Sequence, residues 1–143
     1  MQLSLFCDYS LRMLLYLGAR PEEGGTIREI ALAYGISKNH LMKVSHELVR
    51  HGYLAAKRGR AGGLRLARPA AEINAGEVVR LFESRVPLVE CFPGGNGGCL
   101  LTPACRLKGA LAQAQAAFYD SLSAYTLADL LNKKTVALLA GAP

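Results

Sequence analysis

The sequence predicts a mainly α-helical protein with one small β-hairpin: a winged helix-turn-helix followed by a long C-terminal helix suited to dimerisation. Three observations predict this fold class. Apolar residues recur at helical spacing before residue 51, and a glycine turn there separates two capped helical segments. Two short apolar runs then flank a glycine-rich loop. The length of 143 residues is that of one compact domain, and it is too short for two independent enzyme domains.

The first three helices are expected from their apolar stripes and caps. Residues 3–17 carry one apolar stripe, which predicts a helix that packs against the core. Thr26 and Glu29 have the spacing of a capping box and start a second helix, which Gly35 ends. Ser37 is expected to cap a third helix whose leucines and valines face inward. Helix, tight glycine turn and capped helix are the pattern of a helix-turn-helix.

The hairpin is expected directly after the third helix. Residues 53–57 and 64–66 are predicted to form two short strands, joined by a basic, glycine-rich tip. A helix-turn-helix followed by such a hairpin is a winged helix. We therefore expect residues 1–68 to form a winged helix-turn-helix domain of the DNA-binding type.

Residues 69–101 are expected to form a connector helix and a loop. Asn74 is placed to cap this helix, and the apolar residues that follow, through Phe82, supply its packing face. Pro87 then breaks the helical pattern. The loop that follows is rich in glycine, so its backbone can wrap closely around a bound group.

Residues 102–143 are expected to form a dimerisation helix and a C-terminal segment. The long helix is predicted to start at Thr102 as its cap and to run to Tyr125. Its narrow, alanine-rich stripe suits pairing with a second copy of the helix, and it is equally compatible with packing against its own winged helix. A short final helix is predicted at 127–131, and the alanine-rich end after Lys134 is expected to fray.

Positive charge is concentrated in one part of the chain. The net charge is +6, and residues 38–68 hold eight basic residues and a single acid. Such a surplus favours a polyanionic partner, because it attracts nucleic acid or an anionic surface. In a winged helix, the start of the third helix faces the major groove and the wing reaches phosphates or the minor groove. The expected DNA-binding residues are Ser37, Lys38, Asn39, His40 and Lys43 on the helix, and Arg58, Arg60 and Arg65 on the wing. The alternative is a winged helix that contacts protein, in which the charge serves solubility.

Several classes of protein are disfavoured by the sequence. No apolar run approaches the roughly 18 residues of a spanning helix. Asp8 and Arg12 interrupt the stretch where a signal peptide would be continuously apolar, so we expect a cytoplasmic protein without a membrane partner. No nucleophile and base pair, paired carboxylates or phosphate loop indicates catalysis, so the protein is not expected to be an enzyme. An electron-transfer or thiol-redox protein is the competing class, although it would not need a basic wing.

Three of the four cysteines form a cluster in the sequence. Cys91, Cys99 and Cys105 fall within 15 residues, and the last of them is expected in the first turn of the long helix. In a reducing compartment such a cluster indicates metal ligation or thiol chemistry. Three thiolates without a nearby histidine suit an iron–sulfur cluster with a fourth ligand other than cysteine. Structural zinc and a thiol switch that uses a cysteine pair stay open as alternatives.

Two neighbouring residues of the first helix bear on the fourth ligand. Cys7 lies on the apolar stripe of that helix, so we interpret it as a small buried residue. Asp8 lies beside the stripe, where a carboxylate can serve as an oxygen ligand or remain solvated.

Five segments of the chain resemble a known family. They are 8–12, 34–43 (Tyr-Gly-Ile-Ser-Lys-Asn-His-Leu-Met-Lys), 58–66, 101–107 (Leu-Thr-Pro-Ala-Cys-Arg-Leu) and 125–131. In one register from residue 1 to about 135 they resemble the NsrR repressors, nitric-oxide sensors of a winged-helix family that also includes IscR and RirA. The resemblance implies a bacterial transcriptional repressor that binds a double-stranded, palindromic operator.

The resemblance also implies a cofactor and a signal. In a homodimer, Cys91, Cys99 and Cys105 would hold an iron–sulfur cluster, 4Fe-4S or alternatively 2Fe-2S, and Asp8 of the partner subunit would complete the coordination. Nitric oxide would react with the cluster, break the Asp8 bond first and release the operator. IscR places a histidine ligand three residues after its last cysteine, where this chain has Lys108. RirA shares the three cysteines, so an iron- or redox-responsive repressor stays open.

Overall fold

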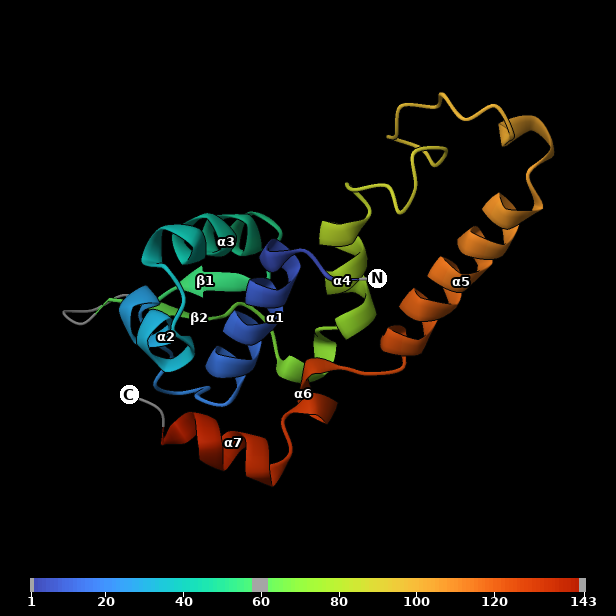
Figure 1. Cartoon of the computed structure of the whole chain (residues 1–143). Coiled ribbons are helices and arrows are strands. Elements are labelled where there is room, and N and C mark those ends of the chain that lie inside the picture. Colours follow the sequence, from blue (N-terminus) through green and yellow to red (C-terminus); the bar gives the residue numbers. More distant parts are fainter. Residues whose placement is uncertain (1, 58–61, 142–143) are drawn as a thin grey trace.

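The computed structural model describes residues 2–57 and 62–141 and confirms the predicted fold class (Figure 1). Its α-helices are α1 (Leu5–Gly18), α2 (Ile27–Tyr34), α3 (Lys38–Arg50), α4 (Ala75–Glu83), α5 (Arg106–Ser123), α6 (Leu127–Leu130) and α7 (Lys133–Ala140). Two 3-10 turns, η1 (Ala70–Glu72) and η2 (Thr102–Ala104), precede α4 and α5. The strands β1 (Leu54–Ala56) and β2 (Leu64–Leu66) form one antiparallel hairpin.

The local signals for α2 and α3 act largely as expected. The Thr26 hydroxyl accepts a hydrogen bond from the Glu29 amide, and the Glu29 carboxylate accepts one from the Thr26 amide, which completes the capping box. Gly35 ends α2 with a φ of 64°, a left-handed conformation that glycine adopts without steric cost. Ser37 does occupy the N-cap position of α3, but its side chain makes no capping hydrogen bond, so that prediction is wrong in its detail.

The hydrophobic core is built around α1, which packs against α3, α4, α6 and β2. Met13, Leu14 and Leu17 of α1 are fully buried, as are Leu48 of α3 and Val78 of α4. Burying a side chain of this kind contributes about 1.5–3 kcal/mol. Because α1 packs against both α3 and α4, a shift of α1 would change its packing against the helix-turn-helix and against α4 together.

The first strand of the wing is shorter than predicted, and the second strand also bonds to the turn before α2. Its paired residues run from Leu54 opposite Leu66 to Ala56 opposite Leu64, so β1 covers only the middle of the predicted 53–57 strand. Gly25, in the turn before α2, exchanges two backbone hydrogen bonds with Leu64 at 3.0 and 2.8 Å. The wing is therefore held to the helix-turn-helix by backbone bonding as well as by side chains.

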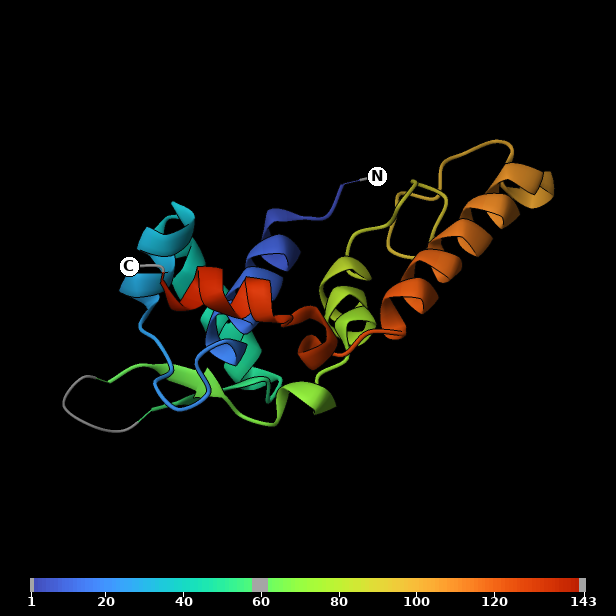
Figure 2. The ribbon, with the colours of Figure 1, turned by 90° about the horizontal axis from the view of Figure 1, so that it is seen from below.

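The C-terminal end of helix α5 packs closely against the beginning of helix α4. A Cβ atom built on Gly76 would collide with the Ser123 side chain and lie 2.6 Å from the Ser123 nitrogen, so only glycine fits this approach. Asn74 caps α4 as predicted and also donates to the Ser123 carbonyl at 2.7 Å. From this crossing α5 extends away from the winged helix, and its other end lies far from the β-hairpin in both views (Figures 1 and 2). Among the described helices, none is long and apolar enough to cross a bilayer.

Two predictions about the C-terminal half are wrong. The long helix starts at Arg106 rather than Thr102, because the residues before Cys105 close only a 3-10 turn and the Thr102 hydroxyl is buried without a partner among the described residues. Residues 133–140 form the helix α7 in place of the frayed end expected after Lys134, and Asn132 caps α7 through the Thr135 amide. Partly buried Leu139 packs against the core, which gives this last helix its tertiary support.

Candidate functional site

The first half of α3 presents polar side chains outward. Ser37, Lys38, Asn39, His40 and Lys43 are all exposed, as the sequence predicted, while Leu41, Val44 and Leu48 face the core. This division follows from the helical period, since residues three and four apart share a face. The His40 ring lies 6.2 Å from the Tyr9 ring of α1, so one of the five polar residues is supported by the neighbouring helix.

Glu47, the only acidic residue among residues 38–68, is paired with basic side chains near the end of α3. Glu47 pairs with Arg50 at 3.3 Å and with Arg85, beyond α4, at 3.5 Å. His51 Nε2 also lies 3.7 Å from its carboxylate. Although desolvation opposes the shift, the hydrogen bond from Arg50 and the charges of Arg50 and Arg85 lower the pKa of Glu47. Its negative charge is thus compensated at the far end of α3.

Two basic residues of the wing have different positions: Arg65 is exposed, and Lys57 is bonded to the protein backbone. Arg65 is exposed on β2, whereas Arg58 and Arg60 lie outside the described residues. Lys57, at the base of the wing, donates to the backbone carbonyls of Glu22 and Glu23. Its ammonium therefore fastens the wing to the turn after α1, a role that charge counting could not reveal because the partners are backbone atoms far away in sequence.

Sequence reasoning also missed other exposed residues of the helix-turn-helix. Met42, His46 and Arg50 follow Asn39 along α3 at steps of three and four residues and are exposed with it. Arg28 is exposed on α2, the helix that crosses the DNA backbone in this kind of fold. The helical period already contained this signal, and it could have extended the predicted surface along α3.

We call residues 86–105 the cysteine segment. Its backbone hydrogen bonds are local: Phe92 donates to Val89, Gly95 to Phe92, and Gly97 to Glu90, at 3.0 to 3.1 Å. Figure 1 shows the segment as an irregular loop between the top of α4 and the start of α5, away from the winged helix. The segment is folded mainly on itself and joins the rest of the molecule through those two helices.

The three predicted ligands all lie on the cysteine segment. Cys91 and Cys105 are half-buried, and Cys99 is exposed. Cys105 is the N-cap of α5 and has an extended backbone, so the prediction that it lies in the first helical turn is wrong by one residue. Within residues 2–57 and 62–141, no group of three histidine, cysteine or acidic side chains is arranged to hold a metal ion.

The two residues singled out on α1 differ in accessibility. Cys7 is completely buried, as predicted, and burial together with the nearby Glu83 carboxylate raises the pKa of its thiol to about 12. Cys7 is therefore kept as a thiol inside the core. Asp8 is on the surface, where its Oδ1 atom lies 2.9 Å from Arg12 Nε and its side chain is 34% exposed.

The fold and its basic surface define a winged-helix DNA-binding protein, because a polar recognition helix and a supported wing lie on one domain. The chain belongs to the Rrf2 family, whose model, described as an iron-dependent transcriptional regulator, matches residues 3–133.

Two relatives and one solved structure agree with this assignment. The chain is 51% identical to an HTH-type transcriptional regulator NsrR of Geobacillus kaustophilus, over 94% of this chain and 92% of that protein. It is 48% identical to an NsrR of Shouchella clausii, over 92% and 89% of the two chains. The oxidised form of Staphylococcus aureus CymR superposes with a TM-score of 0.72 at 28% identity, covering 92% of this chain and 97% of CymR. These matches confirm the resemblance to NsrR regulators and the expectation that the chain is a transcriptional regulator and not an enzyme.

Proposed function

We propose that this chain is a homodimeric repressor whose operator affinity is controlled by an iron–sulfur cluster that reacts with nitric oxide. The observation that carries the proposal is the separation of the four cysteines. Three lie on the cysteine segment outside the helical core, and the fourth, Cys7, is buried within it. A loop outside the helical core with three thiols, one exposed and two half-buried, suits a sensor better than a structural site. Relatives named NsrR support the same assignment.

The donor set fits an iron–sulfur cluster. Cys91, Cys99 and Cys105 would supply three thiolates, and Asp8 of the partner subunit would supply an oxygen. A bound cluster would provide iron that reacts with nitric oxide; we propose the 4Fe-4S type, with 2Fe-2S as the alternative. Asp8 is accessible for this role because it lies on the surface of α1, where its carboxylate is held by Arg12. Arg12 would keep that carboxylate oriented when no ligand competes for it.

The dimer is supported by exposed apolar surface around α5. Tyr119 is the only buried residue of that helix, and Leu107 near its start is 64% exposed. An apolar groove of about 260 Å³ opens between α1, α4, α5 and α6, where Leu11, Leu15 and Leu122 are among its lining residues. Exposed apolar surface of this kind is typical of an interface. We propose that residues 102–143 join two copies, that 69–101 supply the connector and the cluster loop, and that 1–68 bind DNA.

In this dimer the two α3 helices would enter successive major grooves of a palindromic operator. Lys38, Asn39 and Lys43 would contact base edges, and Ser37 and His40 would lie at the edge of the same groove. Arg65 and the neighbouring wing residues Arg58 and Arg60 would contact phosphates or the minor groove. Lys57 would hold the wing in a fixed position relative to the helix-turn-helix.

Arg65→Ala is expected to weaken operator binding without changing the cysteine segment. Loss of one phosphate contact should reduce the slope of log affinity against log salt concentration by about 1. The measurement is a titration of a fluorescent operator duplex at several salt concentrations. Lys133→Ala removes one exposed charge from α7 and is the matched control, for which the slope should stay unchanged. An unaltered slope for Arg65→Ala would argue against a phosphate contact.

The proposed control by nitric oxide is tested on protein purified without oxygen. The absorption spectrum and the iron, sulfide and zinc contents come first, followed by binding to the duplex that is enriched most strongly from a random DNA library. We expect a brown protein with comparable iron and sulfide that loses DNA affinity as nitric oxide is added. A colourless protein that contains zinc would contradict the sensor while leaving DNA binding intact.

An iron-responsive repressor is the second candidate, and the description of the matching family model as iron-dependent favours it. The same sample distinguishes the two functions. Removal of iron by a chelator would release DNA in both cases, but release by substoichiometric nitric oxide under constant iron is expected only of the nitric-oxide sensor.

A further inference from the structure

The end of α4 is the junction between the cysteine segment and the helices that bind DNA. Helix α4 ends at Glu83, and the cysteine segment begins a few residues later. Two side chains at this junction reach back into the winged helix, one toward α1 and one toward α3. Both contacts join residues that are far apart in sequence, so local helix formation does not account for them.

Glu83 forms hydrogen bonds with Ser4, the N-cap residue of α1. Its Oε1 atom accepts a hydrogen bond from the Ser4 amide at 3.0 Å and a second one from the Ser4 hydroxyl at 2.6 Å. The Ser4 hydroxyl in turn accepts from the Cys7 amide at 3.2 Å and caps α1. Two hydrogen bonds from one residue thus converge on a single carboxyl oxygen of Glu83. Glu83 therefore fixes where α1 begins, and Asp8 lies in the first turn of that helix.

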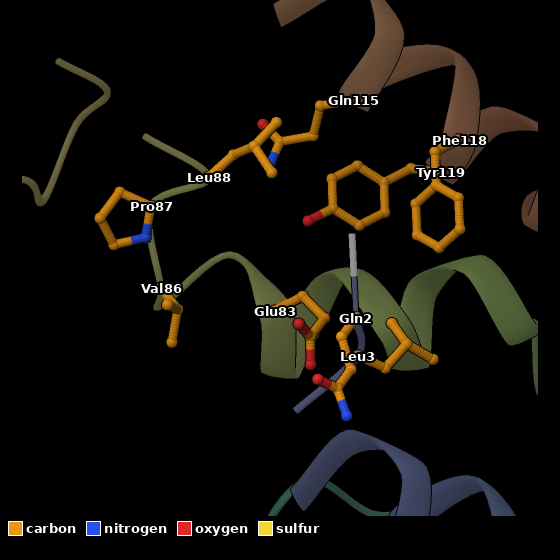
Figure 3. A pocket seen from close by; sticks show the side chains of 9 residues that line it. All are labelled: Gln2, Leu3, Glu83, Val86, Pro87, Leu88, Gln115, Phe118 and Tyr119. Carbon is orange, nitrogen blue, oxygen red and sulfur yellow. The ribbon is translucent and has the colours of Figure 1, made fainter. Parts of the chain in front are cut away.

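The cysteine segment borders on the same place. Figure 3 shows a cavity beside Glu83 in which Gln2 and Leu3 lie near its carboxylate, and Val86, Pro87 and Leu88 form another wall. This cavity of about 200 Å³ is also lined by side chains of α5, including Tyr119. Movement at the start of the cysteine segment would therefore alter the space around the residues that lead into α1.

Arg85 makes the second connection. Its guanidinium lies 3.5 Å from Glu47 on the C-terminal half of α3. The same region is packed by His51, whose ring meets the Phe82 ring edge-on at a centroid distance of 6.4 Å. An ion pair between exposed groups contributes little to stability, so its presence points to orientation more than to strength. Rotation of the end of α4 would act on α3 at this point.

We propose that Glu83 and Arg85 are positioning residues that transmit a change in the cysteine segment to helices α1 and α3 of the winged helix. Glu83 acts through Ser4 on α1, and Arg85 acts through Glu47 on α3. The inference rests on the proposed function, but it concerns a connection within one chain, separate from any bond between Asp8 and a cluster on the partner subunit.

The test compares, for each variant, operator affinity with and without the cluster. The DNA is the duplex enriched from the random library, and the iron content of each protein sample is measured beforehand. For Glu83→Ala and Arg85→Ala, the ratio of the two affinities should fall at least about fivefold relative to wild type. Arg80→Ala is the matched control, because Arg80 of α4 pairs with Asp120 of α5 at 3.4 Å and lies over the Tyr119 ring of the same helix. Glu83→Gln retains an acceptor oxygen and should keep most of the ratio, and exchange of the Glu47 and Arg85 charges should restore what Arg85→Ala loses.

Hydrogen exchange of the metal-free protein gives a readout that does not depend on the cluster. The Cys7 and Asp8 amides, which are bonded to Ser4, should exchange about tenfold faster in Glu83→Ala than in wild type. Unchanged exchange would overturn the part assigned to Glu83. A wild-type affinity ratio near one would overturn the proposed function itself, whereas a high wild-type ratio that both alanine variants keep would overturn only this inference.

Discussion

Replacing Cys105 with serine is expected to abolish retention of iron and sulfide and, with it, tight operator binding. Serine keeps the size of the side chain, but its hydroxyl is far less acidic than a thiol and is a poor ligand for iron. Cys105 is the N-cap of α5 and makes no capping hydrogen bond with its side chain, so the change should leave the helix intact. Iron and sulfide counts on protein purified without oxygen provide the measurement.

The matched control for this experiment is Cys7→Ala. Cys7 is completely buried in the core and is protonated, so its removal should not change the iron content. It should cost stability by leaving a small cavity, which thermal unfolding detects. Normal iron and sulfide in Cys105→Ser would remove this residue from the ligand set, and loss of the cluster in Cys7→Ala would show that the assignment of the four cysteines is wrong.

Gly76→Ala is expected to destabilise the protein more than an alanine substitution at any other glycine of α4 or α5. The new Cβ would meet the Ser123 side chain and backbone, and the backbone cannot move aside as a flexible side chain could. Overpacking of this kind costs about 1–3 kcal/mol. In a chain of this size the corresponding fall in Tm is about 3–10 °C, measured by circular dichroism or calorimetry.

Gly109→Ala provides the contrast. Beyond its own helix and its chain neighbours, no atom lies within 4 Å of the position that its Cβ would occupy, and the residue is exposed near the start of α5. Alanine there should raise stability by about 0.5–1 kcal/mol, because it reduces the entropy lost on folding. If both substitutions raise Tm, helix propensity rather than the close approach of α4 and α5 controls the result.

Much of the helix-turn-helix was predictable because its signals are local. The Thr26 and Glu29 pair and the Asn74 cap act within three residues of themselves, so the sequence pattern and the structure agree. Helix α7 was missed because its short apolar stripe gains stability only when Leu139 meets the core. The start of α5 was misplaced since Pro103 is compatible with both an α-helix and the 3-10 turn that forms there.

The candidate site divides in the same way. The exposure of Lys38, Asn39 and Lys43 was predictable from helical period and charge alone. The roles of Lys57 and Glu83 were not, because their partners are the carbonyls of a distant turn and a cap residue at the other end of the domain. Tertiary structure decides which charged residues face a ligand and which hold the fold in register.

The close approach of α4 and α5 at Gly76 also makes α5 a lever with its fulcrum at one end. Eighteen residues of α-helix span about 27 Å, so a tilt of about 10° at the crossing moves the Cys105 end by about 5 Å. The mechanical advantage works in the opposite direction as well. A displacement of about 5 Å at Cys105 becomes a rotation of about 10° at the core, where the side chains close to the crossing move far less than the Cys105 end does.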